Sequence, residues 1–441
     1  MGQSIEQLRH VCALGALQSV LAIPRAVPIL HAGPGCGQKL WGALAEFNGS
    51  QGSGYVGGHC VPCTNMAERD VVFGGEERLR AEISNALRVM DADLFVVLTG
   101  CTADIIGDDV AGIVREFQEA GEPVVFAETG GFKGTNYLGH ERILTAIIEQ
   151  HLQDVAPPPR QTGVVNLWSV VPYQDTLWSG NLEALTSLLT DLGLHVNNIF
   201  GHDGGIQAID RIPAAELNLL VSPWVGLNTV QLLQARFGTP FLHYPVLPIG
   251  PSETGAFLRA VAAQLGIDAP RVEPYIREQE ARYYYYMERC GDFIFESRSG
   301  MPTRFVTISD SVYALGIARF LINDLGLLPE AQFIVDDVPD AHQPAITALF
   351  QDVVEGIRTP VTFVTDGGEI GDAIRNLHFH SRPFIIGSTW DRVIAREING
   401  FPLSVSLPVS DRLILSRTYV GYEGALRLAE DLYSVLLGEY Q

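Results

Sequence analysis

Leu94-Phe-Val-Val-Leu-Thr-Gly-Cys101 is the stretch that decides the fold of this chain. Residues 94–98 are continuously apolar, which is typical of a strand covered on both faces. Gly100 and Cys101 end this strand, and the spacing of apolar residues predicts a helix over 104–117. Pro123-Val-Val-Phe-Ala127 predicts the next strand. A strand, a helix and a second strand in this order are the repeating unit of a parallel sheet.

The same alternation recurs twice further along the chain. The later predicted strands are residues 163–168, 217–221, 240–244, 304–308, 332–335, 361–364 and 383–386, and the later predicted helices are 181–192, 311–324, 424–437 and one ending near 265. A long aromatic segment, 272–295, is interpreted as a helix that crosses between units. Pro157-Pro-Pro159 is the best candidate for a linker, because three prolines continue neither a helix nor a central strand. The pattern predicts an α/β fold of three doubly wound domains with parallel sheets, at residues 1–160, 161–300 and 301–441.

Length and composition agree with this organisation. The chain has 441 residues, and domains hold roughly 150 residues each. Hydrophobic residues make up 47% and charged residues 18%, which excludes a mainly disordered protein. The net charge of −22 argues against nucleic-acid and membrane-surface partners, since both are anionic. With neither a long apolar stretch nor a signal-peptide pattern, we expect a soluble cytoplasmic protein without structural disulfides.

Five of the six cysteines fall within the first 101 residues. Cys12, Cys36 and Cys101 each lie beside glycines or other small residues at the end of an expected element. Cysteine thiolates hold iron–sulfur clusters, and glycines allow backbone N–H groups to approach the sulfur atoms. Three thiolates are one fewer than the usual four, which indicates that a second chain completes the site. The alternative interpretation of these residues alone is three buried, inert cysteines.

Other candidate residues give weaker signals. Cys60-Val-Pro-Cys63 is compatible with a redox dithiol, half of a zinc site or extra thiols near a cluster. Cys290 is expected to pack in the core, and His31 is more often a turn-capping residue than a ligand. Asp108-Asp109 after Gly107 indicates a helix-start or loop pair, where carboxylates accept free N–H groups.

Several common site motifs are absent from the sequence. No Gly-x4-Gly-Lys-[Ser/Thr] occurs, so any ATP would be bound by another protein. Gly52-Ser-Gly-Tyr-Val-Gly57 has the spacing of a dinucleotide loop, but no strand precedes it, and it is interpreted as a flexible loop. Neither Gly-x-Ser-x-Gly nor His-Glu-x-x-His is present, so nothing supports a hydrolase.

With these cysteine contexts, the sequence resembles the β-type (K) subunit of the catalytic component of the nitrogenase superfamily. The matching stretches follow one another in collinear order over nearly the whole chain. They are Cys12-x-x-Gly15-Ala16, His31-Ala-Gly-Pro-Gly-Cys36, Glu68 to Val72-Phe73-Gly74-Gly75, Cys101-Thr-Ala-Asp-Ile-Ile-Gly-Asp-Asp109, Glu280 to Tyr286, Asp310-Ser-Val-Tyr-Ala-Leu-Gly316, Asp411-Arg-Leu-Ile-Leu415 and Tyr419-Val-Gly-Tyr422.

The resemblance implies three Rossmann-like domains of the nitrogenase component 1 type and an α2β2 heterotetramer with an α-type (D) catalytic subunit. It implies that Cys12, Cys36 and Cys101 bind this chain's share of a P-cluster-type iron–sulfur cluster, [8Fe-7S] or [4Fe-4S]. The α-type subunit would bring three more cysteines and hold the substrate-reducing cofactor. An ATP-dependent iron–sulfur reductase, itself a homodimer, would dock transiently and deliver electrons. Neither nucleic acid nor membrane is an implied partner.

Three departures from molybdenum nitrogenase β subunits indicate which member this is: a very short segment before Cys12, the 129–140 segment Thr-Gly-Gly-Phe-Lys-Gly-Thr-Asn-Tyr-Leu-Gly-His, and the pair Cys60/Cys63. They are closer to nitrogenase-like reductases, and we favour the K subunit of methylthio-alkane reductase, which cleaves C–S bonds in compounds such as dimethyl sulfide. The runner-up is the β subunit of an iron-only or vanadium nitrogenase reducing dinitrogen. A cofactor-assembly scaffold of the same fold is disfavoured by the complete set of three cysteines. A metal-free binding protein is the remaining alternative.

Overall fold

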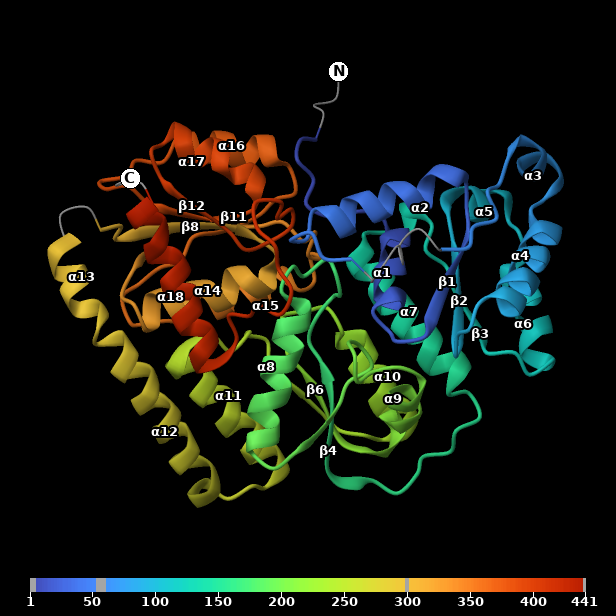
Figure 1. Ribbon diagram of the computed structural model, residues 1–441, viewed down its shortest axis with the longest axis horizontal. Helices are drawn as coiled ribbons and strands as arrows, with labels where there is room; N and C mark the ends of the chain where they lie inside the picture. Colours follow the sequence, from blue (N-terminus) through green and yellow to red (C-terminus); the bar gives the residue numbers. More distant parts are fainter. Residues whose placement is uncertain (1–4, 53–60, 298–300, 439–441) are drawn as a thin grey trace.

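The computed structural model describes residues 5–52, 61–297 and 301–438. Three separate parallel sheets form its framework (Figure 1). The first sheet has the order β1-β2-β3, made of β1 (Ala26–His31), β2 (Leu94–Thr99) and β3 (Val124–Ala127). The predicted strands 94–98 and 123–127 are therefore present, and the predicted α/β class with parallel sheets is confirmed.

The second and third sheets are also entirely parallel. The second has the order β5-β4-β6-β7, with β4 (Gln161–Trp168), β5 (His195–Asn197), β6 (Ala215–Leu220) and β7 (Phe241–His243). The third has the order β10-β9-β8-β11-β12, with β8 (Arg304–Ser309), β9 (Leu328–Ile334), β10 (Val361–Phe363), β11 (Phe384–Gly387) and β12 (Phe401–Ser404). Each sheet falls inside one predicted domain range; the boundaries near 160 and 300 themselves stay predictions.

The position of strand β2 in the fold explains why residues 94–98 are all apolar. Phe95 and Val97 face one side, where they pack with α4 (Glu76–Val89) and α6 (Val110–Glu119). The alternating residues of β2 face the other side and join a core that includes α1 (Leu17–Leu21) and α7 (Asn136–Ala146). Because both faces are covered by helices, a polar side chain on β2 would be buried on either face.

The structure differs from the predicted elements at several places, and the short strands β5 and β12 are among the elements that were not predicted. The helix expected at 104–117 is two helices, α5 (Cys101–Ile106) and α6, because Gly107 ends α5 in the left-handed conformation with φ +78. The crossing helix at 272–295 is likewise two, α12 (Ala269–Met287) and α13 (Cys290–Ser297). Strand β1 was not predicted. Its Pro28 weakens a strand signal, but the proline is tolerated because β1 is the first strand of its sheet's order.

The remaining helices connect the strands and cover the sheets. They are η1 (Ala13–Ala16), α2 (Pro34–Trp41), η2 (Gly42–Glu46), α3 (Glu68–Phe73), η4 (Gly131–Lys133), η5 (Ile147–His151), α8 (Trp178–Asp191), α9 (Ile206–Arg211), η6 (Ile212–Ala214), α10 (Leu227–Phe237), α11 (Gly250–Leu265), α14 (Ser311–Asn323), α15 (Gln343–Gln351), α16 (Gly367–Arg375), η7 (Thr389–Asp391), α17 (Arg392–Glu397) and α18 (Gly421–Gly438). Among the described residues, none of the helices is both long and apolar enough to cross a membrane.

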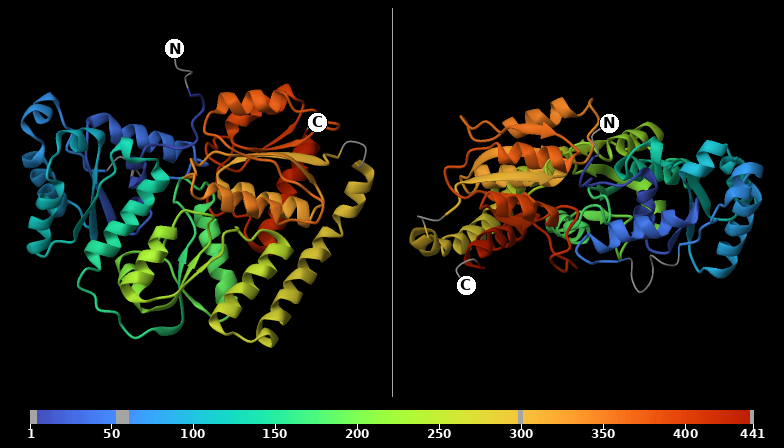
Figure 2. Two further views of the ribbon diagram at one scale, coloured as in Figure 1. Left: turned by 180° about the vertical axis from the view of Figure 1, so that it is seen from behind. Right: turned by 90° about the horizontal axis from the view of Figure 1, so that it is seen from above.

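The three sheets share one continuous hydrophobic core. Helix α18 lies against α11 and α12 as well as against β12, so the end of the chain packs on both the second and the third sheet (Figure 1). The N-terminal segment passes between the first and third sheets (Figure 2). There Arg9 forms a buried ion pair with Asp391 at 2.8 Å, and the Gly367 N–H donates to the Glu6 carbonyl at 2.8 Å.

Candidate functional site

Two of the three predicted cysteines lie at one edge of the first sheet. Strands β1 and β2 run in parallel, with His31 opposite Thr99 at their carboxyl ends. Cys36 lies in the first turn of α2, shortly after β1, and Cys101 opens α5 directly after β2. The carboxyl edge of an open parallel sheet is where such folds place their ligands. The strand order therefore brings together residues that are 65 positions apart in the sequence.

Gly131 marks the place where Cys101 and Cys12 meet. Its backbone N–H donates a hydrogen bond to Cys101 Sγ at 3.1 Å. A Cβ atom built on Gly131 would lie 3.1 Å from Cys101 Sγ, 3.2 Å from Cys12 Cβ and 3.7 Å from Cys12 Sγ. Both sulfur atoms thus face the same backbone position.

Cys12 is held in this position by the segment that follows Gly131. It forms an isolated antiparallel bridge with Thr135, and Ala13 N–H donates to the Gly134 carbonyl at 2.9 Å. Val11 N–H donates to Asn136 Oδ1 at 3.1 Å, and Asn136 N–H donates back to the Val11 carbonyl at 2.9 Å. These backbone contacts fix Cys12 without using its thiol, which stays exposed.

Cys36 lies within electrostatic reach of the other thiols. Burial raises the pKa of its thiol, and the neighbouring groups Cys12, Cys63 and Cys101 raise that pKa further. A thiol whose pKa is raised stays protonated until a cation binds it, and metal binding then releases the proton. Cys36 and Cys101 thus follow neighbouring strands at one sheet edge, Cys12 meets Cys101 at Gly131, and Cys63 is a fourth thiol in this region.

The fourth cysteine, Cys63, belongs to a segment that runs alongside β1. Leu30 N–H donates to the Pro62 carbonyl at 2.8 Å, and Thr64 N–H donates to the Leu30 carbonyl at 2.9 Å. Cys63 Sγ lies 3.5 Å from the Ala32 carbonyl that it donates to, and burial raises its pKa. Its partner in the CxxC motif, Cys60, lies outside the described residues, as does most of the Gly52–Gly57 loop.

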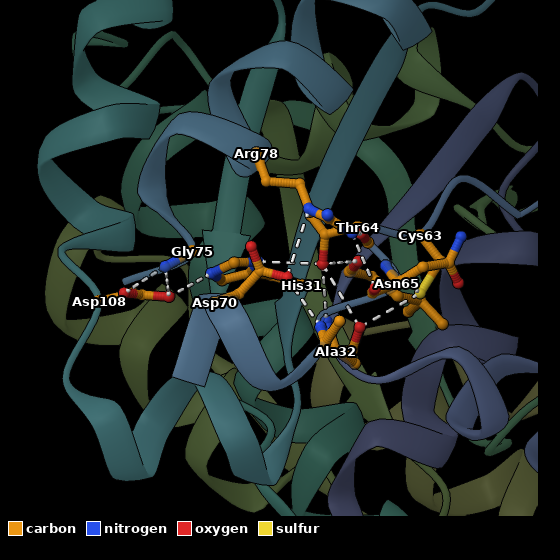
Figure 3. A network of polar contacts seen from close by, with 11 residues as sticks. His31, Ala32, Cys63, Thr64, Asn65, Asp70, Gly75, Arg78 and Asp108 are labelled. Atoms are coloured by element: carbon orange, nitrogen blue, oxygen red, sulfur yellow. Dashed lines mark hydrogen bonds and ion pairs between the residues drawn. The ribbon is translucent and has the colours of Figure 1, made fainter. Parts of the chain in front are cut away.

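A buried polar network lies at the carboxyl end of β1, beside Cys63 (Figure 3). His31 Nε2 is 2.8 Å from Asp108 Oδ2, and His31 Nδ1 is 3.2 Å from Thr64 Oγ1. Both oxygens of Asp108 accept the Gly75 N–H, at 3.0 and 3.1 Å. Burial lowers the pKa of His31, while Asp108 opposes that shift. The network ties the end of β1, the end of α3 and the end of α5 to one another.

The pair Asp108-Asp109 lies in the connection between α5 and α6, just before the start of α6, as predicted for a helix-start or loop pair. Asp109 caps α6, accepting the Gly112 N–H at 2.8 Å. Asp108 instead turns inward to His31, so it acts as a partner for a buried histidine. No sequence signal marks this pair, because the two residues are 77 positions apart. Cys290, expected in the core, is only partly buried at the start of α13.

Exposed apolar side chains lie on the segments that carry or adjoin Cys101 and Gly131. Phe132 follows Gly131 and is 60% exposed, and Ile105 in the helix opened by Cys101 is 73% exposed. Phe73, at the end of the neighbouring helix α3, is 81% exposed. Clustered apolar side chains at a surface mark a binding interface. Exposed thiols and exposed apolar side chains thus occur on the same segments of the chain.

The donor set fits a cluster better than a single ion. Among the described residues, no three His, Cys, Asp or Glu side chains lie close enough together to hold one metal ion. A zinc site built from this chain's described residues is therefore not present. An iron–sulfur cluster has several metal atoms with separate thiolate ligands, so its cysteines are spaced more widely and can come from two chains. Cys12, Cys36 and Cys101 meet these requirements.

A second polar cluster, missed by the sequence analysis, lies where the second and third sheets meet. Its residues follow the ends of β4, β6, β8 and β9, and they line a cavity of about 20 Å³. Burial raises the pKa of three of the carboxyls, Asp175, Asp310 and Asp336, to about 6 each. A cavity of this size holds about one water molecule. The sequence did contain a signal for this cluster, because Asp310 and Asp336 each come shortly after a predicted strand.

Comparison with known proteins gives a consistent picture. The family model described as nitrogenase component 1 type oxidoreductase matches residues 12–437. The chain is 25% identical to the nitrogenase molybdenum-iron protein beta chain of Sinorhizobium fredii, over 94% of this chain and 80% of that one. It is 24% identical to one of the subunits of light-independent protochlorophyllide reductase from Synechococcus, over 84% of this chain and 72% of the relative.

Two further comparisons concern an alpha chain and a solved structure. The nitrogenase molybdenum-iron protein alpha chain of Methanosarcina barkeri is 26% identical over 63% of this chain, and the match spans about half (52%) of that relative's length. The solved structure titled "Nitrogenase Cp1 at pH 6.5" superposes with a TM-score of 0.79 at 18% identity, covering 100% of this chain and 95% of the other. The likeness to that structure establishes the fold.

Proposed function

This chain belongs to the nitrogenase component 1 type oxidoreductases, and we propose that within this family it is the β-type subunit, which relays electrons. The observation that carries the proposal is the convergence of the predicted cysteines. Cys12 and Cys101 face one backbone position at Gly131, and Cys36 lies near enough for both thiols to raise its pKa. A nitrogenase beta chain and a protochlorophyllide reductase subunit both match most of the chain's length, which supports the proposal.

In the proposed site, Cys12, Cys36 and Cys101 bind one half of an iron–sulfur cluster as thiolates. Bound there, the cluster would supply a store for single electrons. The chain's own contribution is to position Cys12 through hydrogen bonds of its neighbours and Cys101 Sγ through the Gly131 N–H, with exposed apolar side chains on the adjoining segments. Excluding water is important because solvent exposure shifts the potential of such clusters.

The exposure of Cys12 and Cys101 supports a shared site. Left uncovered, these thiols would face solvent, and the apolar side chains of Ile105 and Phe132 would too. We propose that an α-type subunit covers this face, contributes the missing cluster ligands and forms an α2β2 heterotetramer with this chain. Electrons would come from an ATP-dependent iron–sulfur reductase that docks transiently.

The junction between the second and third sheets supports a relay role over a substrate-binding one. This junction lies at the carboxyl ends of strands from both sheets, where α/β proteins bind ligands. Its cavity of about 20 Å³ has room for about one water molecule, and accommodates neither an organic cofactor nor a metal cluster. We therefore propose that the substrate-reducing cofactor is held by the α-type subunit.

For the substrate, we propose methylthio-alkanes such as dimethyl sulfide, reduced with cleavage of a C–S bond. The proposal rests on the segment from Thr129 to His140, which differs from molybdenum nitrogenase β subunits and which supplies Gly131 to the cysteine site. Reduction of dinitrogen by an iron-only or vanadium enzyme is the alternative.

The test of the relay site uses the anaerobically co-purified complex with its α-type partner. We expect iron in the wild-type complex and a relay-cluster EPR signal that Cys101→Ala abolishes while the signal of the α-chain cofactor persists. Cys290→Ala is the matched control, because Cys290 lies in α13, far along the chain from the site. An iron-free wild-type complex, or an unchanged signal in the Cys101 variant, would refute the assignment.

The substrate test follows from metal analysis of the same complex. Molybdenum or vanadium at stoichiometric levels would favour dinitrogen as the substrate. With neither present, turnover of dimethyl sulfide is compared with turnover of dinitrogen, both driven by the reductase and ATP. Thiol release without ammonia formation is the expected result, and ammonia as the main product would overturn the substrate proposal. A complex that contains iron but turns over neither substrate would point to an assembly scaffold.

A further inference from the structure

The loop from Thr129 to Lys133 approaches the cysteine site through its backbone. At its centre, Gly131 donates its N–H to Cys101 Sγ at 3.1 Å. A sulfur atom bound to iron carries partial negative charge, and a hydrogen bond to it becomes stronger as the cluster gains an electron. We propose that the Gly131 N–H sets the reduction potential of the relay cluster. This inference rests on the proposed function, because it concerns the same site.

The space around Gly131 explains why this position carries no side chain. A Cβ atom there would lie 3.1 Å from Cys101 Sγ and 3.2 Å from Cys12 Cβ, which is closer than nearly all side-chain contacts in proteins. A side chain at this position would require the loop or the two cysteines to shift by a few tenths of an ångström. The glycine thus allows the N–H to reach the sulfur and allows Cys12 to approach from the other side.

The neighbouring residues hold the loop against the helix that begins with Cys101. Thr129 N–H donates to Thr99 Oγ1 at 2.9 Å, and Thr129 Oγ1 donates to the Thr99 carbonyl at 2.9 Å. On the other side, Lys133 Nζ lies 2.9 Å from Asp104 Oδ2, in the first turn of α5. Gly131 is therefore fixed between two anchors, both on the segment that carries Cys101.

The anchor formed by Lys133 places a positive charge near the site, and neighbouring carboxylates compensate that charge. Lys133 Nζ lies 2.9 Å from Asp104 Oδ2 and 2.5 Å from Glu128 Oε2. Two carboxylates pair with one ammonium group, so the loop brings no net positive charge to the cluster. The N–H of Gly131 is then the specific contribution of this loop to the sulfur. We regard Gly131 as a positioning residue, since it would act through Cys101.

The test measures the midpoint potential of the relay cluster in the purified complex by EPR-monitored redox titration. In Gly131→Ala the added methyl group displaces the N–H from the sulfur, and the reduced state loses a hydrogen bond. We expect the potential to shift to more negative values. The control is Gly42→Ala, the same substitution at a glycine whose Cβ would meet nothing within 4 Å, and it should leave the potential at the wild-type value.

A Gly131→Ala complex with a full cluster and a wild-type potential would overturn the inference. If that variant loses its cluster, the wild-type complex labelled with ¹⁵N-glycine decides the question. Pulsed EPR of the paramagnetic cluster should then show coupling to a glycine amide nitrogen and to an exchangeable proton. Absence of both couplings would refute the hydrogen bond. Failure of the proposed function is distinguishable, because it would leave the wild-type complex without a cluster at all.

Discussion

Replacing Asp336 by Asn should stabilise the protein near neutral pH. Asp336 is 1% exposed, and its Oδ2 accepts bonds from Trp224 Nε1 at 2.9 Å and Ser311 Oγ at 2.6 Å. An asparagine oxygen can accept both of these bonds. Burial, helped by the charge of nearby Asp310, raises the pKa of Asp336 from 3.8 to about 6. The charged carboxylate is therefore held in an unfavourable place, and the substitution removes the charge.

The magnitude and its pH dependence follow from the two pKa values. Between pH 4 and 6 the folded state binds more protons at this carboxyl than the unfolded state does, so stability falls as the pH rises. Above pH 6 the cost stays constant at about 3 kcal/mol, because one pKa unit corresponds to about 1.4 kcal/mol. Asp336→Asn should recover up to that amount at pH 7.5 and almost nothing at pH 4.

Thermal unfolding followed by circular dichroism at both pH values is the assay. With an unfolding entropy of about 2.1 cal/mol/K per residue, 3 kcal/mol corresponds to a rise in Tm of about 3 °C for a chain of this length. Asp154→Asn, at an exposed position, is the control and should change Tm little at either pH. A variant that is less stable than the wild type at pH 7.5, or equally stabilised at both pH values, would show that the charge of Asp336 is not the cause.

Three further perturbations test other parts of the structure. Arg9→Met should destabilise the fold by about 3–5 kcal/mol, because it leaves the Asp391 carboxylate buried without its partner; a double variant with Asp391→Asn should recover much of the loss in thermal unfolding. Phe132→Asp should weaken binding of the α-type subunit by about tenfold or more, measured by size-exclusion chromatography and biolayer interferometry, whereas Val393→Asp on α17 should not. Cys63→Ala should leave the iron content per αβ pair unchanged, and a lower content would make Cys63 a further ligand.

The sequence alone predicts the parts of the fold that depend on local pattern. The apolar run of β2 and the glycine and cysteine that follow it are visible as a strand end, and the structure has them there. The break between α5 and α6 was missed because the apolar spacing continues across Gly107, and only its left-handed conformation reveals the end of the helix. Strand β1 was missed because Pro28 argues against a strand. A proline is tolerated on an edge strand, and the sequence does not show that β1 lies at the edge of its sheet.

The sequence marks the candidate cysteines, but it does not indicate how they lie relative to one another. Cys12, Cys36 and Cys101 stand out because each lies beside small residues. The contact between Gly131 and Cys101 depends on how two loops at the same sheet edge fold against each other, and the residues are 30 positions apart. The pairing of His31 with Asp108 is equally non-local, and no residue near either in the sequence indicates it.

The exposure of Cys12 and Cys101 also has a consequence for the order in which the complex is made. Under the proposed function, a lone copy of this chain would offer half of a binding site, with two thiols exposed to solvent and to oxidants. Metal insertion is then expected only after the two different chains have met, so the number of loaded complexes is limited by whichever chain is scarcer. Cells that make this chain in excess would accumulate a form that carries no metal and is the first to be lost under oxygen.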